Sequence, residues 1–515
     1  MSQEHLGWRQ SLNSLKHPRV LSMLFFGFSA GIPLLLIFSS LSLWLREAGV
    51  ERSTVTYFSW AALAYSFKFL WAPLIDRLPV PFLTAKLGRR RAWLLVSQFA
   101  IMLSIAMIAM VNPAQESALT VMAIAVVMLG FSSATQDIVI DAYRIESVGS
   151  DLQALMSSTY IAGYRIGMLV SGAGALLLAS SFGSSAEVYV YDAWRAAYLF
   201  MSLTMLVGLI TTCVIKEPSV NESLGRAFTS VQYGRFLCLF MASIGLFVMA
   251  YIFGSEPAEN AKSALGDLFE NTALANLLVE CMRLIIGFLL VAIFIRCLSY
   301  TSLYEKDLIY ESYVAPVEEF FSRYGLRLAL LLLVFVGFYR ISDIVLGVIS
   351  NVFFQDMGFS KTEIATVVKS FGLFMTITGG FLGGILSARY GVIRMLYVGA
   401  VLTVATNLLF MLLAQAGYNI ELLYFVISAD NLTAGLASAA FIAFLSSLTN
   451  ISFTAVQYAI FSSLMTLLPK VIGGYSGSMV DNLGYSNFFL IASLMGLPVI
   501  ALIYWIQRYT AFKDA

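Results

Sequence analysis

The chain has 515 residues, of which 59% are hydrophobic and only 12% are charged, and its mean hydropathy is +0.83. Soluble domains are about half apolar and about a quarter charged, so this composition predicts a polytopic membrane protein and not a soluble domain. The formal net charge of +1 is not that of a nucleic-acid-binding surface, and we expect no nucleic-acid partner.

The cysteines and histidines limit the chemistry that the chain can perform. All four cysteines fall inside or at the edge of apolar runs, and the two histidines, His5 and His17, precede the first run. No cysteine has the spacing of a metal ligand. We therefore expect no disulfide, no metal site and no histidine-based catalysis.

Apolar runs long enough to cross a bilayer, which needs about 20 residues per helix, follow one another along the chain. The first six lie near 20–45, 55–75, 92–112, 118–142, 153–181 and 194–215. Two more lie near 235–254 and 273–297, and a last six near 326–354, 362–388, 392–415, 421–446, 453–480 and 486–507. The first run is too long for the apolar region of a cleaved signal peptide, so we expect it to remain as a helix.

Lysine and arginine are concentrated in alternate loops, and this pattern predicts an even number of spans with both termini in the cytoplasm. We expect an all-α membrane protein with fourteen transmembrane helices, grouped as six, two and six. The predicted organisation is a cytoplasmic N-terminus 1–19, an N-terminal half 20–215, a linker with two additional helices 216–325, a C-terminal half 326–507 and a cytoplasmic tail 508–515.

A loop motif occurs once in each predicted half. "WAPLIDRLPVPFLTAKLGRRRAW" follows the second span of the first half, and "GGILSARYGVIRML" follows the second span of the other half. The shared glycines are Gly88 and Gly391, whereas Asp76 of the first copy is replaced by Ala388 in the second. Duplicated six-helix halves are common among secondary transporters.

Two carboxylates lie on the fourth predicted span. Asp137 and Asp141 are four residues apart and share one helix face. Carboxylates at membrane depth are costly and usually face the protein interior or a watery cavity, where they are candidates for binding a proton. The alternative for Asp141 is that it marks the cytoplasmic helix end and pairs with Arg144.

Basic residues recur at depth in other predicted spans. Arg340 and Asp343 are three residues apart, so they either face a binding site or satisfy each other. Lys68 and Arg165 have no obvious local partner. We expect each of them to form a cross-helix pair with Asp137 or to bind a substrate carboxylate.

The loop after the second span resembles the signature loop of the major facilitator superfamily. More specific segments are similar to the anhydromuropeptide permease (AmpG) family: "FGFSAGIPL", "AYSFKFLWAPLIDR", "GRRRAWLL", "SSATQDIVIDAYR", "GYRIGMLVSG", "GFLGGILSARYG" and "SFTAVQYAIFSSL". The resemblance implies the major facilitator fold, with two additional helices between its halves. It also implies a charged cytoplasmic gate made of Asp76, Arg77, Arg89, Arg90 and Arg91.

The function implied by the resemblance is proton-coupled import of GlcNAc-anhydroMurNAc and its peptides across the bacterial inner membrane by alternating access. This would place the chain in cell-wall recycling and, indirectly, in β-lactam resistance. The expected partners are the muropeptide, protons and membrane lipid, with no cofactor and a monomeric state. Asp137 and Asp141 are the expected proton-coupling residues.

A sugar–peptide ligand calls for a mixture of cations, amide side chains and aromatic faces. The residues expected to bind it are Gln136, Lys68, Tyr65, Arg165, Tyr164, Arg340, Asp343, Asn431 and Gln457. In the fold that the chain resembles, the first, fourth, seventh and tenth helices line the central cavity.

Three alternatives remain open at this point. The first is a major facilitator transporter of another anionic solute, such as acetyl-CoA or a nucleotide-like compound. The second is a membrane-embedded transferase or protease, which the absence of H-E-x-x-H and G-x-G-D motifs disfavours. The third is a channel, which duplicated halves with scattered opposite charges disfavour. We expect a protein that is not an enzyme.

Overall fold

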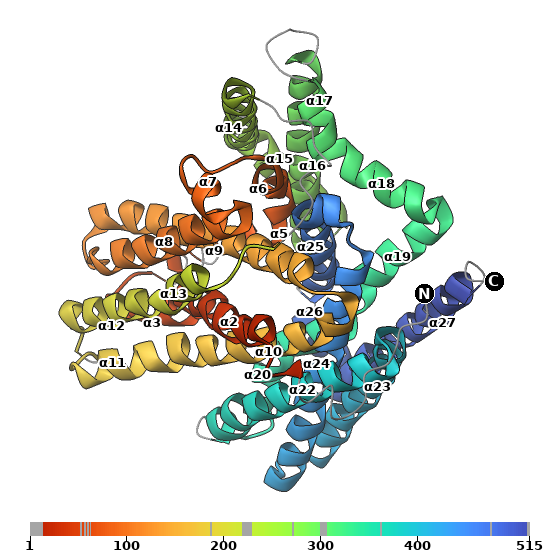
Figure 1. Cartoon of the computed structure of the whole chain (residues 1–515). Coiled ribbons are helices and arrows are strands. Elements are labelled where there is room, and N and C mark those ends of the chain that lie inside the picture. The colour runs from red at the N-terminus through yellow and green to blue at the C-terminus, as the bar shows by residue number, and fades with distance from the viewer. Residues whose placement is uncertain are drawn as a thin grey trace. The chain divides into compact units, whose positions relative to one another are not determined.

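The computed structural model describes residues 14–51, 54–55, 58, 61, 63–185, 188–218, 229–269, 272–298, 306–360, 363–473 and 476–511. Every regular element within these ranges is a helix (Figure 1). Most of the predicted N-terminal segment and the end of the predicted C-terminal tail, residues 1–13 and 512–515, lie outside the described residues.

The N-terminal half combines long helices with short helical segments. Its helices are α2 (Pro18–Ile37), α3 (Ser39–Glu47), α5 (Leu63–Phe67), the 3₁₀ turn η2 (Lys68–Leu70), α6 (Ala72–Arg77), α7 (Leu83–Leu87), α8 (Arg89–Ala109), α9 (Glu116–Ser147), α10 (Ser150–Leu169), the π-helical η3 (Val170–Gly174), α11 (Ala175–Ser181), α12 (Tyr191–Thr204) and α13 (Leu206–Val214).

The C-terminal half is built in the same way. Its helices are α19 (Leu326–Phe338), α20 (Ile341–Asp356), the π-helical η6 (Ile364–Phe371), α22 (Gly372–Tyr390), α23 (Val392–Ala416), α24 (Ile420–Leu448), the 3₁₀ turn η7 (Ile451–Phe453), α25 (Thr454–Gly473), α26 (Ser476–Leu494) and α27 (Leu497–Ala511).

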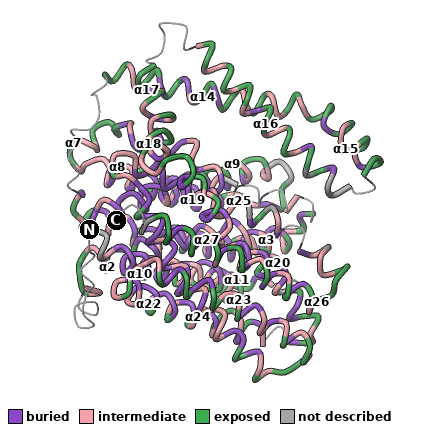
Figure 2. Tube along the Cα trace, turned by 90° about the vertical axis from the view of Figure 1, so that its right-hand side faces the viewer, coloured by how far each residue is buried: buried purple, intermediate pink, exposed green. Residues whose placement is uncertain are grey.

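The chain between the halves forms a separate compact unit, Asn221–Glu319, whereas Met1–Val220 and Phe320–Ala515 together form the other unit. The helices of this middle region are α14 (Ser230–Phe253), α15 (Ser255–Phe269), α16 (Thr272–Leu298), α17 (Lys306–Ile309), the π-helical η5 (Tyr310–Val314) and the start of α18 (Ala315–Tyr324). Residues of α14–α16 are mostly exposed or intermediate (Figure 2). The five-part division of the chain remains a prediction.

An ion-paired cluster joins the helices α14, α15 and α16. Glu280 of α16 pairs with Arg283 at 2.9 Å and with Lys262 of α15 at 2.6 Å. The guanidinium of Arg283 also lies over the ring of Tyr251 on α14, 3.9 Å from its centroid. The segment between the two additional predicted spans therefore contains a helix of its own, α15, and polar contacts tie the three helices together.

Twelve helices in the described part of the chain are long and apolar enough to cross a membrane, so the predicted count of fourteen is not confirmed. They are Pro18–Glu47, Arg89–Ala109, Ala118–Ser147, Leu152–Ser181, Tyr191–Val214, Ser230–Phe253, Leu278–Leu298, Leu326–Asp356, Ile364–Tyr390, Val392–Ala416, Ile420–Leu448 and Met479–Tyr509. The predicted span 55–75 includes residues outside the described ranges, and its described part is broken. The predicted span 453–480 contains only a shorter apolar helix, Ile451–Leu467.

The two copies of the loop motif adopt the same backbone turn. Gly88 links α7 to α8 with φ 88°, and Gly391 links α22 to α23 with the same φ of 88°. Residues with a side chain rarely adopt this left-handed conformation, which explains glycine at both positions. The predicted repeat is thus present as local structure.

Glycines also set how closely helices pack within the N-terminal half. A Cβ at Gly163 of α10 would lie 1.9 Å from the backbone oxygen of Leu24 on α2. A Cβ at Gly27 of α2 would lie 2.1 Å from the backbone oxygen of Tyr160. The two helices, which lie side by side in Figure 1, therefore touch backbone to backbone, as small-xxx-small spacing permits.

Helix α22 presents glycines on two faces. A Cβ at Gly379 would lie 2.0 Å from the backbone oxygen of Leu432 on α24, within the same half. A Cβ at Gly384 would lie 2.0 Å from Ser158 Oγ on α10, in the other half. In contrast, nothing lies within 4 Å of a Cβ built on Gly477 of α26, so this glycine does not mark a close contact.

Replacing Gly163 by alanine is expected to destabilise the protein by about 1–3 kcal/mol, because the added methyl overlaps a backbone carbonyl that cannot rotate away. The check is the fraction of purified protein that stays monodisperse in detergent after heating. The matched control is Gly347→Ala on α20, where nothing lies within 4 Å of the added Cβ. Equal heat resistance of the two variants would contradict this packing.

Candidate functional site

A break in the second predicted span positions Lys68. The helix tightens into the 3₁₀ turn Lys68–Leu70 between α5 and α6, and α6 carries Pro73 in its first turn. Proline has no N–H to donate to the carbonyl four residues earlier, so the α-helical pattern cannot continue unchanged through this point. The Lys68 side chain starts from the turn and is 5% exposed.

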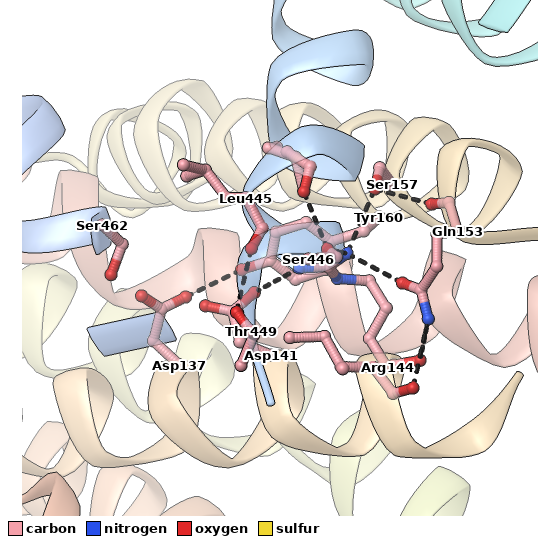
Figure 3. Close-up of polar contacts among 12 residues, drawn as sticks. Asp137, Asp141, Arg144, Gln153, Ser157, Tyr160, Leu445, Ser446, Thr449 and Ser462 are labelled. Carbon is pink, nitrogen blue, oxygen red and sulfur yellow. Dashed lines mark hydrogen bonds and ion pairs between the residues drawn. The ribbon is translucent and has the colours of Figure 1, made fainter. Parts of the chain in front are cut away.

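Lys68 reaches the fourth predicted span, where it pairs with Asp137. Its Nζ lies 2.5 Å from Asp137 Oδ2 and 3.8 Å from Asp141 Oδ2. The hydroxyl of Tyr160 on α10 donates to Asp137 Oδ1 at 2.9 Å (Figure 3). The structure therefore contains the predicted cross-helix pair between Lys68 and Asp137, and one ammonium group serves two carboxylates.

Asp141 lies inside α9 and not at its end, because the helix continues to Ser147. Its Oδ1 accepts a hydrogen bond from Arg144 at 3.2 Å. The pair that their spacing of three residues allows is therefore formed. Arg144 in turn donates to Ser446 Oγ of α24 at 2.6 Å (Figure 3). Asp141 is therefore linked through one side chain to the opposite half of the molecule.

A second polar group contains residues of both halves. Arg340 occupies the break between α19 and α20 and pairs with Asp343 in the first turn of α20. The charge of Arg165 on α10 interacts with the charges of both residues, and Asp430 of α24 interacts with Asp343. Arg165 thus does not pair with Asp137 but faces the charged residues of the C-terminal half.

Two predicted tyrosines lie between the two groups. Tyr164 is within electrostatic range of Asp137 and of Arg165, and its ring centroid lies 6.0 Å from that of Tyr160. Tyr65 of α5 is within electrostatic range of Asp137 and Tyr164. A series of polar side chains therefore extends from α9 towards α20. Its predicted members are Lys68, Tyr65, Asp137, Asp141, Tyr164, Arg165, Arg340 and Asp343.

The structure does not bring three predicted ligand residues to this series. Gln136 is fully buried and faces Ser29 of α2. Successive side chains on a helix point about 100° apart, so Gln136 does not share the direction of its neighbour Asp137. Asn431 accepts from the Thr376 hydroxyl at 2.9 Å and packs α24 against α22. Gln457 accepts from the backbone N–H of Asn450 at 2.7 Å and holds the connection between α24 and α25. The structure places these three residues away from the series, and their contact with a ligand stays a prediction.

The predicted gate residue Asp76 joins the two halves. Its carboxylate accepts from the backbone N–H groups of Ala455 and Val456 at 3.4 and 3.1 Å, in the first turn of α25. Helix N-termini favour negative charge because their first N–H groups lack partners within the helix. Asp76 also pairs with Arg90 at 2.7 Å.

Arg90 is buried and serves two carboxylates of the N-terminal half. Besides Asp76, it donates to both oxygens of Glu146 on α9, at 2.5 and 2.9 Å. Arg89 donates to the backbone oxygen of Asp76 at 2.7 Å. The loop and the end of α9 are therefore fixed to each other, which keeps the Asp76 carboxylate aimed at α25.

The other two predicted gate arginines differ in what they touch. Arg91 donates to the backbone oxygens of Thr212 and Cys213 at 3.0 and 2.8 Å, at the end of α13, so its contacts stay within its own half. Arg77 lies over the ring of Phe453, 6.0 Å from its centroid, and so contacts the C-terminal half. We name the end of the two halves that contains Asp76, Arg89–Arg91 and Gly391 the arginine-rich end.

Sequence reasoning missed several residues of these networks. Glu146 escaped because its partner Arg90 is 56 residues away, and Ser446 because it is 302 residues from Arg144. Glu217, which follows α13, accepts from the backbone N–H groups of Arg90 and Arg91 at 2.7 and 3.0 Å. Burial raises the pKa of the Glu217 carboxyl, although these two hydrogen bonds act in the opposite direction. In the segment "DAYRIES", Asp141 and Arg144 can pair with each other, which leaves the acid Glu146 without a local partner. That was the available signal that Glu146 binds a basic residue elsewhere in the chain.

A cavity of about 500 Å³ lies at the arginine-rich end. Both halves contribute to its lining: Val148, Gly149 and Gln153 come from one half, and Arg394 and Ile451 from the other. A second cavity, of about 610 Å³, lies between the second and fourth predicted spans and is lined mainly by apolar side chains. Neither of these two cavities is lined by Lys68 or Asp137.

The comparisons with known proteins agree with this architecture. The family model described as the Major Facilitator Superfamily matches residues 20–351. The chain is 29% identical over 492 residues to a putative transporter AmpG 4 of Rickettsia conorii, covering 96% of this chain and 97% of the relative. It is 27% identical over 509 residues to the anhydromuropeptide permease of Escherichia coli K12, covering 98% of this chain and 84% of the relative.

Solved structures with much lower sequence identity share the fold. The E. coli fucose:proton symporter FucP in the outward conformation matches with a TM-score of 0.61 and 11% identity, covering 96% of this chain and 99% of FucP. The proton:xylose symporter XylE matches with a TM-score of 0.58 and 12% identity, covering 96% of each chain. The predicted resemblance to the anhydromuropeptide permeases is thus confirmed, and so is the predicted all-helical major facilitator fold.

Proposed function

Because the chain belongs to the Major Facilitator Superfamily, we propose that it is a proton-coupled importer of GlcNAc-anhydroMurNAc and its peptides that works by alternating access. The single observation that carries the proton coupling is the Lys68–Asp137 pair, whose side chains are 5% and 20% exposed. The cargo is supported by relatives named anhydromuropeptide permease and AmpG that match almost the whole chain.

In this proposal Asp137 is the proton acceptor. Its carboxylate is held by the Lys68 ammonium on one oxygen and by the Tyr160 hydroxyl on the other. Protonation removes the attraction between Asp137 and Lys68, so the ammonium is left with Asp141, 3.8 Å away, as its carboxylate partner. The proton therefore changes which charged groups hold the second and fourth spans together.

The second polar group is the proposed site for the cargo. Arg165 and Arg340 come from different halves, and a carboxylate of the muropeptide peptide would be attracted to both. A ligand bound there draws the two halves together, whereas without it the two cations repel each other. Tyr164, which interacts with Arg165, and Tyr65, which interacts with Tyr164, offer aromatic faces for the sugar rings.

The gate in this proposal is the contact between Asp76 and the first turn of α25. Import requires the two halves to separate at the arginine-rich end, which breaks the hydrogen bonds to Ala455 and Val456. We place this end in the cytoplasm, with both termini, because the basic loops gather there. We also propose the bacterial inner membrane as the location, a monomeric state, no cofactor and no enzymatic activity.

The test is uptake of labelled GlcNAc-anhydroMurNAc-tripeptide by the purified full chain in proteoliposomes. We expect accumulation against its gradient when the outside is made acidic and collapse of that accumulation with a protonophore. Accumulation that is indifferent to the protonophore would reject proton coupling, and no uptake of the labelled compound would reject the cargo.

A second candidate cargo is another anionic solute, such as acetyl-CoA or a nucleotide-like compound. The observation that favours it is the convergence of Arg165 and Arg340, which selects negative charge and not a sugar. Competition decides between them, because a tenfold excess of unlabelled acetyl-CoA should leave muropeptide uptake unchanged if the muropeptide is the cargo.

A further inference from the structure

Arg144 has contacts that the proposed proton site and gate do not account for. Its side chain is fully buried, and NH1 donates to Ser157 Oγ at 3.3 Å and to Gln153 Oε1 at 3.2 Å on α10. The same NH1 group donates to Ser446 Oγ of α24 at 2.6 Å, and the guanidinium lies over the ring of Tyr458 on α25, 5.2 Å from its centroid. One side chain of the N-terminal half therefore contacts two helices of the other half.

The contact with Ser446 is distinct from the gate at Asp76. Asp76 binds backbone N–H groups of α25, whereas Arg144 binds the hydroxyl of Ser446 on α24. The two networks use different residues, because Arg90 and Glu146 serve Asp76, and Gln153 and Ser157 serve Arg144. The arginine-rich end is thus held by two separate sets of polar contacts.

The surroundings of Arg144 are balanced in charge. The ionisable groups near Arg144 are Asp141 on α9, Tyr160 on α10 and Tyr458 on α25, and its contact from α24 is the hydroxyl of Ser446. Asp141 in turn interacts with Asp137 on α9 and with Lys68 on η2. With both carboxyl groups ionised, two acids face two bases. When one carboxyl binds a proton, a buried positive charge loses its counter-ion, and buried unpaired charge is strongly unfavourable.

We propose that Arg144 is a positioning residue that links proton binding at Asp141 and Asp137 to the separation of the two halves, and this rests on the proposed proton coupling. Its guanidinium is held between the Asp141 carboxylate and Ser446. Protonation leaves excess positive charge in the cluster, and separation of α9 from α24 and α25 admits water that solvates it. Proton binding therefore favours opening at the arginine-rich end.

The test is disulfide cross-linking across the cavity at this end, in membranes that contain the full chain without added substrate. Cysteines replace Val148 and Ile451, which line that cavity from opposite halves, and serines replace the four native cysteines. The oxidant is copper phenanthroline, and the measured quantity is the cross-linked fraction at pH 7.5 and at pH 5.5. Each fraction is divided by the fraction that the same treatment gives in the denatured protein at the same pH, because protonated thiols oxidise more slowly. In the parent protein we expect a lower fraction at pH 5.5.

The informative variant is Ser446→Ala, which removes the acceptor in the C-terminal half and leaves every charge in place. Hydrogen bonds from a charged donor are strong, so we expect the open-to-closed ratio at pH 7.5 to rise about tenfold. The matched control is Ser447→Ala, because that hydroxyl donates within its own helix to the backbone oxygen of Phe444. The control should match the parent protein at both pH values.

Arg144→Gln should abolish the pH response of the cross-linked fraction, and Arg144→Lys, which restores the charge, should return part of it. If Arg144→Gln does not fold, the cross-linking of Ser446→Ala and of Arg144→Lys still tests the proposed role of Arg144. Parental cross-linking of Ser446→Ala, or a parent protein without a pH response, would overturn the proposal. Because the assay needs no substrate, failed muropeptide uptake with an intact pH response would reject the cargo and not the role of Arg144.

Discussion

Replacing Asp137 by asparagine is expected to abolish accumulation driven by a pH gradient, with a loss of at least about 100-fold relative to the parent protein. The carboxamide has nearly the same shape as the carboxylate but binds no proton, so the step that couples the gradient to transport is lost. Exchange of labelled for unlabelled cargo at equal concentrations needs no net proton movement. We therefore expect exchange to continue at a rate within about tenfold of the parent.

Two uptake experiments with the same proteoliposomes measure this difference, one with an imposed pH gradient and one at equilibrium. The matched control is Asp192→Asn on α12, whose side chain is 83% exposed and pairs only loosely with Arg195 at 3.7 Å. The control should accumulate cargo like the parent protein. Gradient-driven accumulation by Asp137→Asn with an unchanged pH dependence would remove Asp137 from the coupling mechanism.

Substitution of Lys68, the partner of Asp137, tests the same ion pair. Lys68→Ala leaves the Asp137 carboxylate without its cation, and breaking a buried pair in this way costs about 3–5 kcal/mol. The double variant, which also carries Asp137→Asn, no longer contains the unpaired charge and should recover part of the lost heat stability. An additive loss in the double variant would contradict a direct pair.

Replacing Asp76 by asparagine is expected to shift the resting protein towards opening at the arginine-rich end by about 10- to 100-fold. The charged carboxylate accepts from two N–H groups at the start of α25. A hydrogen bond to a charged group contributes about 1.5–3 kcal/mol and a bond to a neutral group about 0.5–1.5 kcal/mol, so each bond is weakened by about 1 kcal/mol in the neutral amide. The neutral amide also loses its pairing with Arg90. The check is labelling of a single cysteine at Ile451 by a thiol reagent applied from that side.

Glu146→Gln distinguishes the role of the Asp76 contact with α25 from the role of the ion pairs that support Asp76. Glu146 and Asp76 both bind Arg90, but only Asp76 has hydrogen bonds to the other half. We expect Glu146→Gln to lower heat stability with a smaller change in labelling at Ile451 than Asp76→Asn gives. Equal labelling of the two variants would show that the bonds to α25 do not hold this end closed.

Some features of the site could be predicted because they depend on local sequence. Asp141 and Arg144 are three apart on a helix, and the same holds for Arg340 and Asp343, so each pair forms as its spacing allows. The Lys68–Asp137 pair could be proposed because two buried charges of opposite sign lacked other partners. The loop repeat was visible as Gly88 and Gly391, because both positions need a positive φ.

Other features could not be predicted because they depend on helix rotation and on contacts between distant segments. Gln136 and Asp137 are adjacent in sequence, yet one faces the interior of its half and the other faces Lys68. Hydropathy gives the length of a span but not the rotation of its helix. Asp76 and Val456 are 380 residues apart, and nothing in either segment alone indicates that a carboxylate will meet a helix start there.

The smooth seam between α10 and α22 has a consequence for how fast the protein can turn over. At Gly384, α22 presents no side chain to Ser158 and Ala154 of α10. Sliding along such a surface requires few rotamers to change, so friction there is low. The activation barrier for reorientation should then come from the charged contacts that must be broken, and salt or pH should alter the rate more than bulkier lipids do.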